Sequence, residues 1–184
     1  MSASDGETSE TRPRAGRALD PLTSRMYDSL KSLANKLVGK RGADGAIDAT
    51  ELVHECYLRL ARIDEFKEMD RAEFLALSST LIRNILVDQA RRKNAAKRGH
   101  GWTRITLSEI SESSNHLEVD LVDLDQAMQL LAQRDVTQAR IVELHFFGGL
   151  TGPEIAQLLE IPRARVHNEW VMARAWLHRQ LFGD

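Results

Sequence analysis

Polar residues that could contact a nucleic acid gather at the start of the last expected helix. They are Arg163, Arg165, His167 and Asn168. An arginine can hydrogen-bond to guanine, and an asparagine can pair with the edge of adenine. Just before them, Thr151 and Glu154 have the T-x-x-E spacing of a capping box. A short capped helix, a turn and a longer helix with a polar start form the helix-turn-helix pattern, which an ordinary helical hairpin with a polar outer face would also produce.

A second cationic group follows the apolar part of the helix expected over residues 71–98. Residues 91–104 hold six Lys or Arg and no acid, whereas residues 109–125 hold six Asp or Glu and no Lys or Arg. The basic run could meet the phosphates of a nucleic acid. It also suits a solvated helix end, because cations favour the negative pole of the helix dipole. The segregation of sign along the chain is itself informative.

Side chains that could act in catalysis lack the partners that catalysis needs. His54 and Glu55 are adjacent, but the second histidine of the H-E-x-x-H pattern is missing. Cys56 lies on an apolar helical stripe. The sequence shows no glycine-rich phosphate loop and no cluster of metal ligands. We therefore expect no enzyme activity, no cofactor and no metal.

Helical periodicity positions these residues. Apolar side chains recur at helical spacing over residues 22–38, 50–63 and 71–98, and Asp48 or Thr50 could cap the second of these helices. Further helices are expected from Leu121, over residues 139–147, after Thr151, and around Val166 to Leu177 at the C-terminal end. No segment shows the alternation of a strand. The predicted fold class is therefore all-α.

Composition divides the chain into two small helical domains and bounds its surroundings. Residues 1–20 carry few apolar side chains and are expected to be a flexible arm, and residues 99–120 are expected to be an acidic linker between domains at 21–98 and 121–184. The net charge of −2 excludes a uniformly basic nucleic-acid coat. One cysteine and no membrane-length apolar run favour a soluble cytoplasmic protein without a membrane partner.

Two blocks of sequence resemble the bacterial sigma factors. GLTGPEIAQLLEIPRARV with EWVMARAWLHRQL resembles region 4, and ATELVHECYLRL with RAEFLALSSTLIRNILVDQARRKNAAKRG resembles region 2. The similarity is to the extracytoplasmic-function branch (group IV), which keeps only these two regions, and within it to a subgroup often linked to Ser/Thr kinases. It covers residues 22–181, so it implies a fold and a function for nearly the whole chain.

The resemblance implies a promoter-recognition subunit of RNA polymerase. In the family, region 2 docks on the clamp helices of the polymerase and captures the single-stranded −10 element, and region 4 reads the −35 duplex and sits on the flap. The polymerase-binding side chains would be Asp48, Thr50, Glu51, His54, Glu55 and Arg59. The side chains that contact the −10 element would be Phe66, Arg71, Ser79, Thr80, Arg83, Arg91, Arg92, Lys93, Lys97 and Arg98. Those that contact the −35 element would be Thr151, Arg163, Arg165, His167, Asn168 and Arg174. Phe66 and the small polar side chains could equally serve only in packing.

The first departure from the family is in the polymerase-binding helix. The family usually has Asp-Ala-Glu-Asp where this chain has Asp48-Ala49-Thr50-Glu51. Phosphorylation of Thr50 would add about −1.5 to −2 charge at a helix N-terminus, where anions are favoured. Thr50 is therefore a candidate phosphorylation site and a Ser/Thr kinase a candidate partner, unless Thr50 simply caps the helix. An anti-sigma regulator is the other candidate.

The second departure is in the last helix. The family usually has Thr-Val followed by Lys or Arg, whereas this chain has Arg165-Val166-His167-Asn168. Arg165 replaces the family's threonine hydroxyl, and His167 replaces its lysine or arginine. Both changes alter contacts with the DNA phosphates, and each lost contact weakens DNA binding. Either the −35 sequence differs or this helix binds DNA weakly. The alternative function is thus a sigma-like interaction protein that binds polymerase or a regulator without recognising promoters.

Overall fold

The computed structural model describes residues 21–38, 47–63, 69–96, 104–106 and 118–183. Within them the chain forms seven α-helices and one pair of short strands, which confirms the all-α class. The elements are α1 (Pro21–Val38), α2 (Ala49–Leu60), α3 (Arg71–Ala96), β1 (Arg104–Thr106), β2 (Glu118–Asp120), α4 (Leu121–Arg134), α5 (Val136–Phe146), α6 (Gly152–Leu158) and α7 (Arg163–Phe182).

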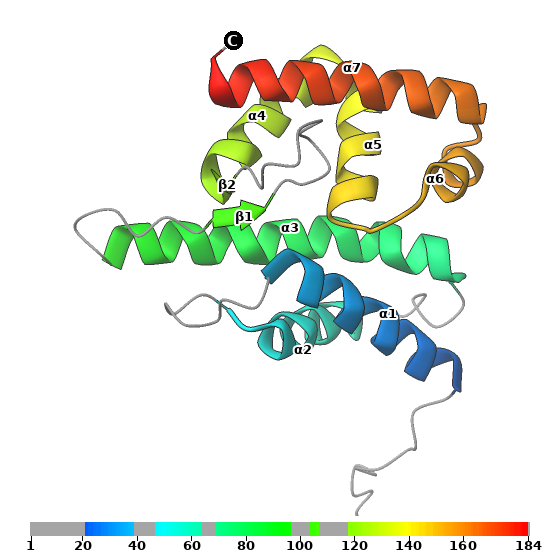
Figure 1. Cartoon of the computed structure of the whole chain (residues 1–184). Helices are drawn as coiled ribbons and strands as arrows, with labels where there is room; N and C mark the ends of the chain where they lie inside the picture. The colour runs from blue at the N-terminus through cyan, green and yellow to red at the C-terminus, as the bar shows by residue number, and fades with distance from the viewer. Residues whose placement is uncertain (1–20, 39–46, 64–68, 97–103, 107–117, 184) are drawn as a thin grey trace, which may run out of the picture.

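The long helix α3 lies at the centre of the fold (Figure 1). Helices α1 and α2 pack against one side of it, and α4, α5 and α6 contact the other side. We call α1–α3 the N-terminal lobe and α4–α7 the C-terminal lobe. Because α3 packs on two sides, apolar side chains on two of its faces are buried, namely Phe74, Leu75, Ile82, Ile85 and Leu86.

The N-terminal lobe depends on a well-defined start of α2. The side chain of Asp48 accepts a hydrogen bond of 2.7 Å from the backbone N–H of Glu51, so Asp48 is the N-cap. Thr50 lies inside the first turn of the helix and is exposed. Of the two cap candidates, the structure therefore selects Asp48, and the explanation of Thr50 as a capping residue is wrong.

The C-terminal lobe begins with two helices that aspartates cap. Asp120 accepts from the N–H of Val122 at 2.7 Å and starts α4, and Asp135 accepts from the N–H of Gln138 at 2.9 Å and starts α5. Helix α5 thus begins at Val136, earlier than the predicted start at residue 139. The apolar pattern missed this turn because Thr137 and Gln138 are polar, and Val136 is exposed and not part of the buried stripe.

The strand pair was not expected from the sequence. β1 and β2 pair antiparallel, with Arg104 opposite Asp120 and Ile105 opposite Val119. Each strand has three residues, too few for the alternation of side chains to be visible in a sequence. β2 runs directly into α4, so the end of the predicted linker is an ordered part of the C-terminal lobe.

Candidate functional site

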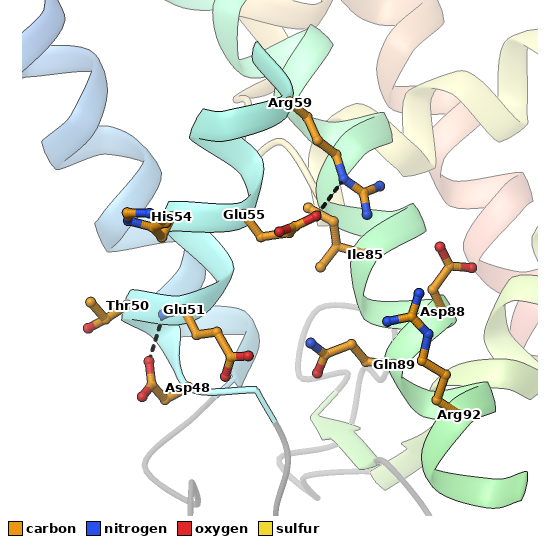
Figure 2. Close-up of a pocket in the computed structure, with 10 residues that line it drawn as sticks. All are labelled: Asp48, Thr50, Glu51, His54, Glu55, Arg59, Ile85, Asp88, Gln89 and Arg92. Carbon is orange, nitrogen blue, oxygen red and sulfur yellow. Dashed lines mark hydrogen bonds and ion pairs between the residues drawn. The ribbon is translucent and has the colours of Figure 1, made fainter. Parts of the chain in front are cut away.

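The first candidate surface is an open groove between α2 and α3, with a volume of about 560 Å³. All six side chains predicted to contact polymerase line it. Figure 2 shows Glu51, Glu55 and Arg59 on the side of α2 that faces α3, whereas Thr50 and His54 point away from α3. Glu55 and Arg59 are held by an ion pair of 3.0 Å. The groove is lined by Asp48, Thr50, Glu51, His54, Glu55, Arg59, Ile85, Asp88, Gln89 and Arg92.

The α2 wall of this groove carries most of the acid. Asp48, Glu51 and Glu55 stand on it, and Asp48 and Glu51 flank the helix N-terminus. The N-terminal end of a helix is partially positive, so it stabilises these carboxylates and would stabilise a further anion. Arg92 lines the α3 wall. The structure therefore groups Arg92 with the polymerase-binding side chains, although the sequence similarity assigned it to the −10 element.

The second surface is the side of α3 that faces the C-terminal lobe, and it holds five of the ten side chains predicted to contact the −10 element. Ser79 is fully buried and its hydroxyl donates to the carbonyl of Ala76 at 2.7 Å. The hydroxyl of Thr80 accepts a hydrogen bond of 3.3 Å from Arg140 of α5. Arg71, the first residue of α3, pairs with Glu154 of α6.

Arg83 and Arg91 on this side of α3 both bind Asp125 of α4. Arg83 approaches one carboxylate oxygen to 2.8 Å through Nη2 and to 3.0 Å through Nε, and Arg91 approaches the other to 3.0 Å. Arg83 also lies 3.6 Å from Glu143 of α5. Asp125 and Glu143 are buried, with exposed fractions of 6% and 9%. Buried carboxylates paired with arginines of this kind are costly to separate.

Of the other side chains assigned to the −10 element, the structure describes only Arg92 and Lys93. Lys93 lies half-buried near the end of α3. Phe66, Lys97 and Arg98 lie outside the described residues. The prediction that these side chains contact the −10 element therefore stays a prediction.

Sequence reasoning missed the acids and the arginine that meet α3 from the other lobe. Asp125, Glu143 and Arg140 were not among the candidate residues. A signal for the two acids existed, because Asp125 lies four residues after Leu121 and three before Met128, and Glu143 lies four after Ala139 and three before Phe146. These four neighbours are buried. A carboxylate at a core position of a helix implies a buried cationic partner.

The third surface is the start of α7. Helix α6 is capped by Thr151 and Glu154, since one oxygen of Glu154 accepts from the backbone N–H of Thr151 at 2.8 Å and from its hydroxyl at 2.7 Å. The turn that follows contains Glu160 with a φ of 54°, a left-handed conformation that reverses the chain before α7. The expected break between the two helices is confirmed.

The side chains assigned to the −35 element lie mainly on the outer side of this turn. Five of the six are exposed, whereas Arg174 is half-buried in the middle of α7. Behind them, Val166 is buried, and Trp170 packs edge-on against His145 with ring centroids 4.4 Å apart. This packing fixes the helix and leaves its polar start facing outwards. The exposed side chains are Thr151, Arg163, Arg165, His167 and Asn168.

Among the residues that the structure describes, Cys56 and Glu154 have shifted pKa values. Burial raises the pKa of the Cys56 thiol to about 12, although a hydrogen bond with Ser78 and the charge of Arg59 act in the opposite direction. Burial alone would raise the pKa of Glu154 as well. The hydrogen bonds from Thr151 and the charge of Arg71 outweigh it, so the pKa of Glu154 lies below its ordinary value of 4.5.

The described parts of the chain contain neither a cluster of metal ligands nor a membrane-spanning helix. Those residues contain no group of three or more His, Cys, Asp or Glu side chains that could hold a metal ion. Among the same residues, no helix has the length and apolar character to span a membrane.

A short capped helix, a turn and a long helix with an exposed polar start define a protein of the helix-turn-helix class. The family of extracytoplasmic-function (ECF) sigma factors matches residues 15–183. This is nearly the whole chain, so the protein belongs to the ECF sigma factors, which are regulatory subunits of RNA polymerase and not enzymes. Neither the curated proteins nor the solved structures gave a match.

Proposed function

We propose that this sigma factor binds core polymerase through the α2–α3 groove and directs transcription initiation at specific promoters. The observation that carries the proposal is the groove itself. It gathers the six side chains of one helix and its cap that sequence similarity assigns to the clamp-helix contact. The carboxylates along the α2 wall would attract a positively charged partner surface and would fix how the sigma factor is oriented on it.

Promoter reading is assigned to the other two surfaces. The exposed start of α7, with Arg163 and Asn168, would enter the major groove of the −35 duplex, where Arg and Asn recognise guanine and adenine. The α3 surface, with Thr80, Arg83 and Arg91, would hold the single-stranded −10 element. Arginines are well suited to the phosphates of such a strand.

The proposal includes regulation by phosphorylation: a kinase that modifies Thr50 would strengthen the binding of core polymerase. Thr50 is exposed in the first turn of α2, and its hydroxyl is not needed as the cap because Asp48 supplies it. A phosphate on Thr50 would restore negative charge where the family usually has a glutamate. The regulator would then be a cytoplasmic Ser/Thr kinase rather than an anti-sigma factor.

One observation favours a second candidate function, a sigma-like protein that binds polymerase or a regulator without reading promoters. Four side chains assigned to the −10 element (Arg71, Thr80, Arg83 and Arg91) have partners on the C-terminal lobe. Their groups are engaged within the protein in this conformation, so single-stranded DNA would have to displace them.

Run-off transcription with purified core RNA polymerase tests the proposal. We would compare the wild type with Thr50→Glu and, as matched control, Thr50→Ala on genomic fragments, and measure core binding of each. Discrete start sites support a promoter-reading sigma factor, and activity restricted to Thr50→Glu supports the kinase switch. Equal core affinity of Thr50→Glu and Thr50→Ala would remove the switch. Core binding without initiation by any variant would favour the second function.

A further inference from the structure

Five charged side chains form one cluster between α3, α4 and α5, which we call the interlobe charge cluster. Its carboxylates belong to Asp125 and Glu143, and its guanidinium groups to Arg83, Arg91 and Arg140. Arg83 and Asp125 are 42 positions apart in the sequence and belong to different lobes. The cluster therefore ties the lobes together.

Asp125 is the centre of this cluster. Its Oδ1 accepts from Arg83, and its Oδ2 accepts from Arg91 at 3.0 Å and from Gln129 at 2.7 Å. Its backbone carbonyl lies 3.4 Å from Nη2 of Arg83. A carboxylate that receives several charge-assisted hydrogen bonds in this way resembles a phosphate group bound by arginines.

Glu143 and Arg140 complete the cluster from α5. Arg140 binds Glu143 at 2.7 Å and donates to the hydroxyl of Thr80 at 3.3 Å. Its second terminal nitrogen lies 3.5 Å from the carbonyl of Ala76. Helix α5 therefore engages two side chains of the α3 surface: Glu143 lies near Arg83, and Arg140 binds the hydroxyl of Thr80.

We propose that Asp125 and Glu143 act as an internal substitute for a nucleic-acid strand, so that the interlobe charge cluster holds the α3 surface closed until the lobes separate. Opening would release Arg83 and Arg91 to the phosphates of a single strand. The inference rests on the proposed function in one respect, the assignment of single-stranded DNA to α3. The closed contact itself rests on the distances above.

The exposure of the two arginines shows how such a device could open. The Arg83 side chain is 17% exposed and Arg91 is 53% exposed. A strand could therefore first exchange with Asp125 at the outer Arg91. Displacement at the inner Arg83 would then require the lobes to part, because Glu143 lies behind it.

The test uses the full-length protein with Asp125→Asn, and Asp123→Asn as the matched control. Asp123 is exposed in the first turn of the same helix, so the control removes the same charge outside the cluster. Spin labels on cysteines introduced at Arg62→Cys and Gln180→Cys report the distance between the lobes. The native Cys56 should not take up the label, because it is buried. Anisotropy of labelled oligo(dT) reports single-strand affinity. Glu143→Gln repeats both measurements if Asp125→Asn loses its helical circular dichroism.

We expect Asp125→Asn to lengthen the label distance and to bind oligo(dT) roughly tenfold more tightly, a difference of about 1.4 kcal/mol. Each new phosphate contact on a single strand adds about 0.7 to the slope of log K against log salt, so two released arginines should steepen it by about 1.4. Asp123→Asn should match the wild type. An unchanged label distance in the folded cluster variant, Asp125→Asn or its replacement Glu143→Gln, overturns the inference, and so does opening without a gain in affinity.

Run-off transcription separates this inference from the proposed function. If the wild type initiates but Asp125→Asn gains no affinity for oligo(dT), the inference fails and the proposed function stands. If Asp125→Asn opens and gains affinity while no variant initiates, the cluster still controls access to α3 and the proposed function fails.

Discussion

Arg71 at the start of α3 forms an ion pair with Glu154 at the start of α6, although 83 positions separate them. Glu154 also receives two hydrogen bonds from Thr151. One carboxylate thus caps the first helix of the helix-turn-helix unit and joins that unit to the N-terminal lobe. The orientation of α6 and the closed packing of the lobes consequently depend on the same side chain.

Glu154→Gln should make the protein less stable at neutral pH and less sensitive to acid. The pKa of Glu154 is lower in the folded protein than its ordinary 4.5. Its stabilising contribution is therefore present above pH 4.5 and is lost as the pH falls through the folded-state pKa. The Gln amide oxygen can still accept from Thr151, but it cannot form the ion pair with Arg71. We therefore expect a loss of about 0.5–1 kcal/mol at neutral pH, the range of an exposed ion pair, measured by urea denaturation.

Glu160→Gln is the control for that experiment. Glu160 is exposed in the turn after α6, so the substitution removes the same charge without breaking the ion pair with Arg71. Its unfolding free energy should follow the wild type at each pH. A Glu154→Gln protein that loses stability in acid as steeply as the wild type would contradict the assigned role of the carboxylate.

The helices were largely predictable because each buries a periodic apolar stripe. α1 and α2 lie close to the predicted ranges, and α3 is predicted as far as it is described. Local polar chemistry was harder to read. Asp48 and Thr50 are both common cap residues, and only the backbone geometry distinguishes them.

The relation between the lobes could not be read from helical periodicity. Asp125 ends the acidic run of residues 109–125, most of which lies in the predicted linker, yet it is buried against Arg83 and Arg91. Periodicity reports which face of a helix is buried, but it does not name the partner. The candidate side chains of the groove were easier, because five of the six lie within a single helix, α2, and the sixth is its cap.

Gly148→Ala should destabilise the protein where α5 ends against α3. A Cβ at position 148 would lie 2.5 Å from the backbone oxygen of Leu144 and 3.3 Å from the Cβ of Ser79 on α3. The backbone oxygen cannot move away as a side chain can, so we expect a loss of about 1–3 kcal/mol. Thermal unfolding measures it. Gly152→Ala is the control, since nothing lies within 4 Å of its added Cβ, and a similar loss there would contradict the steric explanation.

Cys56 should resist alkylation in the folded protein. Burial raises the pKa of its thiol to about 12, against an ordinary value of 9.0, so the reactive thiolate is scarce at neutral pH. Iodoacetamide should label it only in urea, at a rate that follows the unfolded fraction. Leu58→Cys places an exposed thiol on the same helix and should label at once. Equally fast labelling of Cys56 in the native wild type would show that α2 is not packed as described.

The raised pKa of Cys56 should also make the folded protein less stable as the pH rises above 9.0. Above pH 9.0 the unfolded chain loses its thiol proton while the folded chain retains it. A raised folded-state pKa therefore lowers stability as the pH rises from the unfolded value towards the folded one. Cys56→Ala should lose less stability than the wild type over this alkaline range, measured by urea denaturation.

The start of α7 should separate two kinds of DNA contact. Arg163 carries a charge and Asn168 does not, and both are exposed. If Arg163 contacts phosphate, Arg163→Ala should flatten the slope of log K against log salt by about 0.9 on the −35 duplex. If Asn168 reads a base, Asn168→Ala should cost about 1–3 kcal/mol on the preferred duplex and leave that slope unchanged.

Arg179→Ala provides the matched control for these DNA measurements. Arg179 is exposed in the last turn of α7, so its loss removes one positive charge from the same helix far from the proposed contact. If Arg163 contacts a phosphate locally, Arg163→Ala should change the slope of log K against log salt more than Arg179→Ala does. Equal effects of the two would indicate a diffuse electrostatic attraction. The His167-Asn168 departure from the usual family pattern would then mark a helix that no longer reads the −35 sequence.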